Sequence, residues 1–271
     1  MYHNFFIHSS IERHLVYFQF LNIMNKLAAA TLALYSYDPN PDDTSTENLM
    51  RQSMSLISRF PVIISHAYQA KRRYFDGGSM YLHNPDPDRS TAENILHLIR
   101  PDGNYTDAEA KLLDRCLIIH AEHGAGNNSA FATRVASSSG TDTYSAIAAA
   151  VGALKGPRHG GANLKVCEMF DDIKAHINDW EDEDAIYDYL LKILRKEAND
   201  HSGLIYGMGH AVYTLSDPRA VALKSAARPV AEKTGHLPEF NLIETVERLT
   251  PKAFAEIRGD DVKVMCANVD M

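Results

Sequence analysis

The sequence has few cysteines and no long apolar run. Its three cysteines, Cys116, Cys167 and Cys266, are far apart in a chain of 271 residues, and no CxxC pair occurs. An odd and sparse set argues against a disulfide framework and favours reduced thiols in a cytoplasmic protein. We expect Cys116 and Cys167 to be small buried residues of helices. No stretch of about 18 or more apolar residues is present, so no membrane span is predicted.

Basic residues are in the minority. The chain has 27 Lys and Arg against 35 Asp and Glu, which gives a formal net charge of -8. This balance argues against a general nucleic-acid binder. Apolar residues make up 45% of the chain, enough to bury a sizeable core. We therefore expect a globular protein with no nucleic-acid or membrane partner.

The apolar residues recur at helical spacing almost throughout, which predicts an all-α fold. Thr106 and Glu109 form a candidate capping box, and Pro61 is expected to begin a new helix. The alanine-rich stretch 141–155 predicts a buried or interface helix. The most strand-like segment is 262–270. The character of the sequence changes after His159, which predicts a boundary near residues 156–163 and two domains, residues 1–160 and 161–271.

The first candidate motif is "HAEHGAGNNSA", which begins at His120. His120 and His123 are three residues apart at the end of a helix and so share one face. Two imidazoles at this spacing can bind a metal ion, but no matching Cys or Asp cluster follows. A metal-dependent hydrolase is therefore a weak alternative, and we predict no metal site.

The second motif, "LKGPRHGGAN", places His159 on a glycine-rich turn ahead of a helix expected to start near Asn163. The positive field at a helix N-terminus disfavours protonation of a nearby imidazole. A neutral imidazole can donate a hydrogen bond to a carbonyl or oxyanion. The alternative is an ordinary interhelical turn with an exposed histidine.

The third motif is "GLIYGMGHAVYTLSDPRA", from Gly203 to Ala220. Its glycines leave backbone amides accessible to an adenine or a phosphate, although it is neither a GxGxxG motif nor a P-loop. His210 follows the last glycine. Arg219, next to a rigid Asp-Pro turn, suits carboxylate binding through its planar guanidinium. Asp217 alone is typical of a helix cap.

The fourth motif is the terminal "CANVDM". Asp270 follows an apolar run, and a partly desolvated carboxylate with a raised pKa suits a general base. The alternative is a frayed terminal acid, because only Met271 follows. Together the motifs supply a base, neutral histidines and an arginine, the set that an enolisation and condensation reaction requires.

These stretches, with "SSSGTDTYSAIAAAVGALKGPRHGGAN" and the terminal "ANVD", resemble the citrate synthase family in the right order over residues 23–270. The resemblance implies an all-helical, two-domain homodimer that condenses acetyl-CoA with oxaloacetate and hydrolyses the citryl thioester. It implies no metal and no cofactor, since the coenzyme A thioester is a substrate.

The resemblance also implies residue roles. Asp270 abstracts the acetyl methyl proton, His159 stabilises the enol, and His210 protonates the oxaloacetate carbonyl. His123 and Arg219 bind oxaloacetate. The coenzyme A site is lined by the loop residues Leu204, Ile205, Tyr206, Gly207, Met208 and Gly209.

The sequence departs from the family at both ends. Family members continue past the aspartate into a Tyr-Ser-Gly segment, and residues 1–21 do not resemble the family's N-terminal segment. We therefore expect a chain truncated at both ends, with Asp270 frayed and with weak or no activity on its own. Two alternatives stay open: a 2-methylcitrate synthase that uses propionyl-CoA, and a catalytically dead binding or dimerisation fragment.

Overall fold

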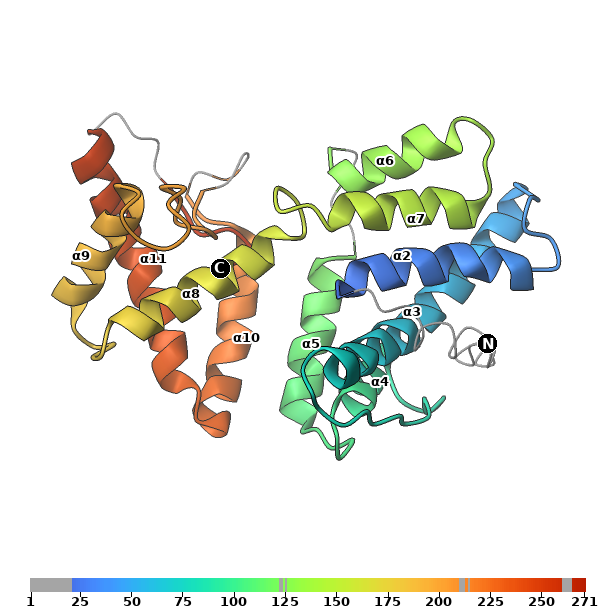
Figure 1. The fold of residues 1–271 in the computed structure, drawn as a ribbon, viewed down its shortest axis with the longest axis horizontal. Helices are drawn as coiled ribbons and strands as arrows, with labels where there is room; N and C mark the ends of the chain where they lie inside the picture. Colours follow the sequence, from blue (N-terminus) through green and yellow to red (C-terminus); the bar gives the residue numbers. More distant parts are fainter. Residues whose placement is uncertain (1–20, 122–123, 125, 210–212, 214, 260–264) are drawn as a thin grey trace. The chain divides into compact units, whose positions relative to one another are not determined.

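The computed structural model describes residues 21–121, 124, 126–209, 213, 215–259 and 265–271. The chain divides into two compact units, residues 1–159 and 160–271, and each is described by itself. The described residues form α-helices and one short 3-10 helix, and none of them belongs to a strand (Figure 1). The all-α prediction is confirmed.

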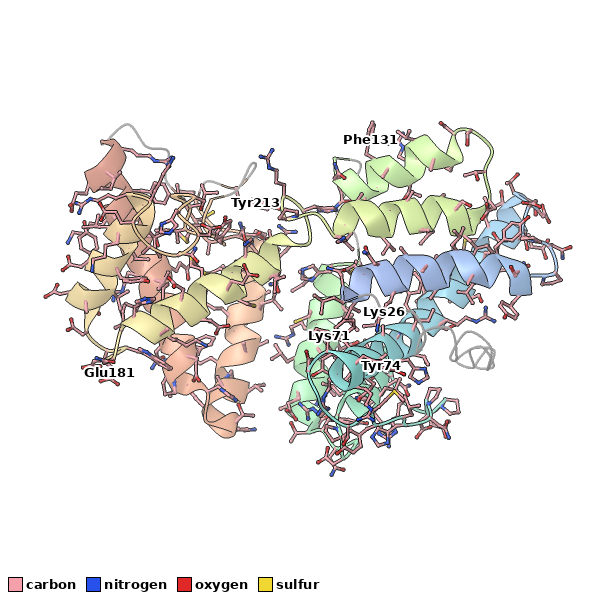
Figure 2. All side chains as sticks on the ribbon, in the orientation of Figure 1. Lys26, Lys71, Tyr74, Phe131, Glu181 and Tyr213 are labelled. Atoms are coloured by element: carbon pink, nitrogen blue, oxygen red, sulfur yellow. The ribbon has the colours of Figure 1, made fainter. Side chains whose placement is uncertain are left out.

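The N-terminal unit is a set of packed helices: α2 (Ile23–Leu34), the 3-10 helix η1 (Tyr35–Tyr37), α3 (Thr46–Tyr74), α4 (Thr91–Ile99), α5 (Asp107–Ile119), α6 (Asn128–Ser137) and α7 (Thr143–Leu154). The alanine-rich α7 packs against both α2 and α6 (Figure 1). Its small side chains allow this close approach on two sides. α6 itself buries no residue completely and exposes Phe131 (Figure 2).

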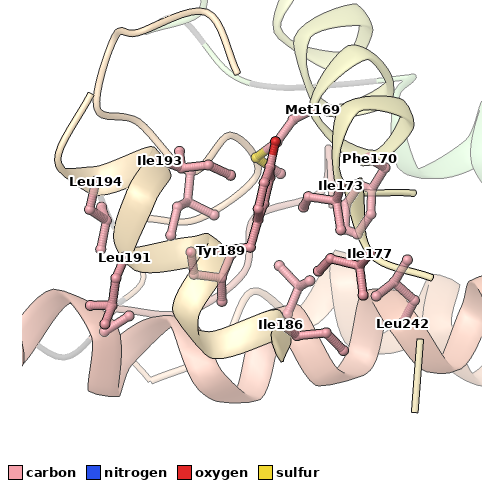
Figure 3. Packing of buried hydrophobic residues seen from close by; sticks show 14 of the residues in the cluster. Met169, Phe170, Ile173, Ile177, Ile186, Tyr189, Leu191, Ile193, Leu194 and Leu242 are labelled. Carbon is pink, nitrogen blue, oxygen red and sulfur yellow. The ribbon is translucent and has the colours of Figure 1, made fainter. Parts of the chain in front are cut away.

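The C-terminal unit contains α8 (Ala162–His176), α9 (Glu183–Leu194), α10 (Pro218–Thr234) and α11 (Leu237–Arg258). Its core is an apolar cluster in which Ile173 on α8, Ile186 on α9 and Leu242 on α11 come together (Figure 3). On each of these three helices the buried apolar residues recur at helical spacing. Each helix therefore buries one face and leaves the other exposed to solvent.

Capping residues fix where the helices begin. Ser90 and Thr106 each form a capping box, with Glu93 and Glu109 respectively, which satisfies otherwise unpaired amides of the first turn. The predicted box at Thr106 is therefore confirmed. Arg100 pairs with Glu109 at 2.7 Å and leads the groups that, with Thr106, lower the pKa of Glu109 to about 2.

Asp38 is a polar junction at the end of η1. Its carboxylate accepts hydrogen bonds from the hydroxyl of Tyr144 at 2.6 Å, from Arg51 at 2.6 Å and from Gln52 at 3.1 Å. Burial acts to raise the pKa of Asp38, but these bonds and one from the Asn40 amide outweigh it and hold the pKa at about 2. One carboxylate thus ties the end of η1 to α3 and α7.

The prediction of a helix start at Pro61 is wrong. Residues on both sides of Pro61 belong to one helix, α3, which is 29 residues long. Proline removes a single amide donor, the one that would bond one turn back. Leu56, Val62 and Ile63 are buried in the same apolar cluster, and this shared burial holds the helix together across the proline.

Two other expectations are corrected. Of the strand-like segment 262–270, residues 260–264 lie outside the described part of the chain, and Ala267 makes a single antiparallel bridge with Met208. Cys167 is exposed and Cys116 is only partly buried, because the helical pattern places neither on a fully buried face. No helix of the described residues is long and apolar enough to cross a membrane.

Candidate active site

The His159 turn lies between the end of α7 at Leu154 and the start of α8 at Ala162, one residue before the predicted start. The backbone amide of His159 donates to the carbonyl of Gly156 at 2.9 Å, which closes a tight turn. The His159 side chain is half-buried in the N-terminal unit. The turn therefore fixes the histidine backbone, and its imidazole orientation must come from another contact.

That contact is with Ser129 at the start of α6. The Ser129 Oγ lies 2.5 Å from the His159 Nε2, across 30 residues of sequence. Asn127 caps α6 by accepting the amide of Ala130 at 3.0 Å, and its Oδ1 also lies 3.0 Å from the Ser129 Oγ. The cap of one helix therefore positions the hydroxyl that orients His159.

Ser129 has one hydroxyl proton and two acceptors for it, so the site has two hydrogen-bond arrangements. In the first, Ser129 donates to Nε2 of His159, and the imidazole carries its own proton on Nδ1 as a donor. In the second, Ser129 donates to Asn127, and Nε2–H of His159 donates to Ser129, which leaves Nδ1 as an acceptor. Only the first presents a neutral donor to a substrate carbonyl.

Of the two histidines of the first motif, His120 lies within the described residues. His120 is the C-cap of α5, and its Nδ1–H donates to the carbonyl of Cys116 at 2.7 Å. His123 lies outside the described residues. Within the described part of the chain, no group of three His, Cys, Asp or Glu side chains is placed to hold a metal ion. The geometry around His120 is that of a helix end.

In the C-terminal unit, Arg219 is held by its own helix cap. Asp217 is the N-cap of α10, and its carboxylate accepts the Arg219 amide at 2.9 Å. The same carboxylate accepts from Nε and Nη2 of Arg219 at 3.1 and 2.7 Å. The Asp217 side chain is 0% exposed and Arg219 is 22% exposed, so the pair aims a partly open guanidinium. The expected capping role of Asp217 is confirmed.

The glycine-rich loop Leu204–Gly209 is paired with the terminal segment 265–271. The Gly209 amide donates to Cys266 at 2.8 Å, the Asn268 amide donates to Gly207 at 2.9 Å, and the Asn268 side chain donates to Gly209 at 3.0 Å. Gly207 has φ 82° and Gly209 φ 92°, left-handed values that glycine adopts readily. A Cβ on Gly207 would also lie 3.1 Å from Met271.

This pairing holds Asp270, and the expected fraying is wrong. The Asp270 amide donates to the Asn268 side chain at 2.9 Å, and the Met271 amide donates to the Asn268 carbonyl at 3.2 Å. Asn163 in the first turn of α8 donates to the Asp270 carbonyl at 3.5 Å. Met271 packs against the apolar core of the unit. Backbone hydrogen bonds and this contact anchor the aspartate.

Hydrogen bonding to Asp217 is the main cause that raises the pKa of Arg219, and the negative charge of Asp270 contributes in the same direction. A cavity of about 280 Å³ opens beside Asp270, with Val166, Phe170 and Leu242 among the apolar side chains of its wall. The wall also includes Asp171, Lys174 and Glu239, so the C-terminal unit places Asp270 beside a space of mixed polar and apolar lining. His210 lies outside the described residues.

Sequence reasoning missed Ser129 and Asn268, which orient His159 and hold Asp270. Ser129 stands inside the quoted motif "HAEHGAGNNSA", two residues after a helix-capping asparagine. Asn268 stands in "CANVD", where an asparagine two residues before an acid is typical of a side chain that accepts the later amide. Local sequence thus held both signals, but the long-range partners came only from the fold.

Comparisons with known proteins point to one family. The family model "Citrate synthase, C-terminal domain" matches residues 3–271. A citrate synthase of Acidithiobacillus ferridurans is 34% identical over 253 residues, which cover 91% of this chain and 59% of that protein. The 2-methylcitrate synthase 1 of Corynebacterium glutamicum is 32% identical over 214 residues, covering 78% and 51% respectively.

The fold agrees as well. The ternary complex of carboxymethyl coenzyme A and oxaloacetate with the citrate synthase of the archaeon Thermoplasma acidophilum has a TM-score of 0.74 and 22% identity. The match covers 98% of this chain and 64% of that one. The chain thus spans about half to two thirds of the length of these relatives. On the family match and the identity over most of its length, the chain belongs to the citrate synthase family.

Proposed function

We propose that the chain takes part in the condensation of acetyl-CoA with oxaloacetate that gives citrate and free coenzyme A. The observation that carries the proposal is Asp270, held on the segment that pairs with the glycine loop, in the same unit as Arg219. Family membership supports it, and the Thermoplasma relative was solved with carboxymethyl coenzyme A and oxaloacetate. No metal or cofactor is part of the proposal.

In this mechanism Asp270 removes a proton from the acetyl methyl group. The thioester oxygen then gains charge, and Nδ1–H of His159 donates to it while Ser129 donates to Nε2. The enol carbon attacks the ketone of oxaloacetate, whose oxygen takes a proton from His210. Water then hydrolyses citryl-CoA.

Binding roles are assigned to the remaining residues. His123 and Arg219 hold the carboxylates of oxaloacetate, since a guanidinium fixed by Asp217 presents parallel N–H donors. The backbone of Leu204–Gly209 lines the coenzyme A site. Because Gly209 lacks a side chain, an extended ligand can approach the loop backbone at this position.

We further propose that the chain acts as a cytoplasmic homodimer through its N-terminal unit. α6 supports this assignment because it leaves Phe131 and Val135 62% and 54% exposed, an apolar surface that a second copy can cover. Sedimentation of the full chain tests it. A monomer at micromolar concentrations would overturn the dimer and leave the chemistry untouched.

The reaction is tested by oxaloacetate-dependent release of free thiol from acetyl-CoA. The Asp270→Asn variant, which lacks the proposed base, serves as the background. We expect release above that background only when both substrates are present. Release that is equal in the two proteins overturns Asp270 as the base.

Two alternatives are separated by related measurements. A 2-methylcitrate synthase is among the relatives, and Val166, Phe170 and Leu242 form an apolar part of the cavity beside Asp270, which favours propionyl-CoA as a second candidate substrate. Competition between acetyl-CoA and propionyl-CoA in one assay measures the preference. Oxaloacetate binding by calorimetry without thiol release indicates a catalytically inactive binding fragment.

A further inference from the structure

The turn that precedes the glycine loop has an uncommon backbone. We call residues 196–203 the clamp turn. Within it Lys196, Asn199 and His201 have φ of 66°, 54° and 57°, left-handed values that side-chain-bearing residues rarely adopt. The Lys196 carbonyl accepts a hydrogen bond from Nδ1–H of His201 at 3.0 Å, and this bond within the turn stabilises its strained conformation.

The clamp turn grips the glycine loop through one side chain. The hydroxyl of Tyr206 donates to Oδ2 of Asp200 at 2.7 Å, and the hydroxyl of Ser202 lies 3.3 Å from the same phenol oxygen. The other carboxylate oxygen of Asp200 accepts the Ser202 amide at 3.1 Å. Asp200 therefore holds the loop side chain and its own turn at once.

The ionisation states of Asp200 and Tyr206 favour their hydrogen bond at neutral pH. Burial acts to raise the pKa of Asp200, but hydrogen bonds from Ser202 and Tyr206 and the nearby Lys165 outweigh it, so the pKa lies below its usual value. Burial is also the main cause that raises the pKa of Tyr206. An ionised acceptor thus faces a protonated donor. Lys165, in the first turn of α8, also pairs with Glu168.

The hydrogen bond between Tyr206 and Asp200 fixes the first half of the loop, whereas the terminal segment is hydrogen-bonded to the second half. Gly207 and Gly209 are hydrogen-bonded to residues 266–268, as described above. Leu204 is 48% exposed, and the first half of the loop is held by buried Ile205 and by the phenol of Tyr206. Without the Tyr206 bond, one end of the loop would rest on Ile205 and local turns.

We propose that Tyr206 is a positioning residue for coenzyme A, acting through Asp200. The ring packs against the core, and the hydroxyl locks the loop in the conformation that presents its backbone amides. A loop ordered before binding loses less entropy when the ligand arrives. The inference rests on the proposed function of the loop, and it adds a side-chain role that the backbone contacts do not supply.

The test compares two matched tyrosine variants. Tyr206→Phe removes the clamp hydroxyl and keeps the buried ring. Tyr187→Phe is the control, because the hydroxyl of Tyr187 donates to Glu256 at the same 2.7 Å in the same unit but outside the loop. We measure the dissociation constant of free coenzyme A by calorimetry, the KM for acetyl-CoA and amide hydrogen exchange over residues 204–209.

Tyr206→Phe is expected to weaken coenzyme A binding roughly fivefold to tenfold, because a hydrogen bond to a charged group is lost. The KM for acetyl-CoA should rise by a similar factor, and the loop amides should exchange faster. Tyr187→Phe should change coenzyme A binding less than about twofold, since its hydrogen bond to Glu256 lies outside the loop and its loss leaves the loop conformation unchanged. Asp200→Ala removes the acceptor instead and should match Tyr206→Phe.

The outcomes are distinguishable. If the unaltered chain does not bind coenzyme A, the proposed role of the loop fails and the clamp fails with it. If the unaltered chain binds and both clamp variants bind equally well, the clamp is wrong while the loop assignment survives. If both tyrosine variants lower the melting temperature alike and neither changes binding, the Tyr206 bond is structural only.

Discussion

Each of the two units holds its own candidate catalytic residues in a different way. In the N-terminal unit, polar side chains do the positioning: Ser129 orients His159, and Asp38 joins η1 to α3 and α7. In the C-terminal unit, Asp270 is held by main-chain hydrogen bonds between a glycine loop and the terminal segment, together with the Asn268 side chain. The N-terminal unit therefore depends on particular side-chain groups, and the C-terminal unit depends in addition on particular backbone angles.

This difference decides which substitutions each unit tolerates. A side-chain bond is lost when one atom is removed, but the backbone around it stays in place. A left-handed glycine that touches another segment is different, because any side chain added there strains the backbone and displaces its neighbour. We therefore expect the largest effects from glycine substitutions in the C-terminal unit.

The largest effect is expected for Gly207→Ala. The added Cβ would lie 3.1 Å from the Met271 Cα at a φ of 82°, so the segment that carries Asp270 must move. Met271 must give way by a few tenths of an ångström, and because displacing a base by about an ångström costs about 100-fold, the rate should fall by more than about tenfold. Oxaloacetate-dependent thiol release measures it.

Gly235→Ala is the matched control for this variant. Gly235 has nearly the same φ of 80°, but a Cβ there meets no atom within 4 Å. It carries the conformational strain of about 1–2 kcal/mol without the contact with the terminus. Equal loss of activity in the two variants would show that strain alone matters, and would refute the contact between Gly207 and Met271 as the cause.

The second effect concerns acid stability of the N-terminal unit. Because the pKa of Asp38 is lowered to about 2, its stabilising contribution is present above the ordinary value near 3.8 and is lost as pH falls toward 2. The shift corresponds to about 2 kcal/mol. Asp38→Asn should lower the free energy of unfolding at pH 7 and flatten its decline between about pH 4 and pH 2.

Thermal melting over this pH range checks the prediction. Asp42→Asn is the control, since Asp42 is an exposed neighbour that accepts only from Tyr35, at 2.9 Å. We expect it to leave the pH dependence close to that of the unaltered chain. An Asp38→Asn protein with the same acid transition as the control would contradict the role of Asp38.

The smallest of the three effects is expected for Ser129→Ala. Loss of the hydroxyl leaves His159 without the contact to Nε2 that orients its imidazole, and the rate should fall roughly tenfold. Ser137→Ala, which removes a hydroxyl from the exposed end of the same helix, should leave the rate nearly unchanged. A Ser129→Ala protein with full activity would show that another group orients the imidazole.

The sequence predicted most of the features that depend on local interactions, such as helix formation and helix starts. Helical periodicity gave the all-α class, and the Ser/Thr-x-x-Glu spacing gave the start of α5. The break at Pro61 was wrong because burial on both sides of a proline outweighs one lost hydrogen bond. The pattern at Cys167 misled for the opposite reason, since a helical apolar residue is buried only if another element covers its face.

The site was predictable in its chemistry and less so in its supports. His159, Arg219 and Asp270 stand in motifs that suggest their roles, but their positions depend on Ser129, Asp217 and Asn268. Asp217 is adjacent to its partner in sequence, and its capping role was expected. Ser129 and Asn268 act on groups brought close by the fold, which a linear pattern does not reveal.

The left-handed residues of the clamp turn also have a consequence for engineering. Lys196 and His201 are held in a conformation that costs roughly 1–2 kcal/mol each for residues with a Cβ. Glycine at Lys196 would relieve that strain and leave its carbonyl, the acceptor for His201, in place. Such a substitution should therefore raise the free energy of unfolding without altering any group assigned to substrate.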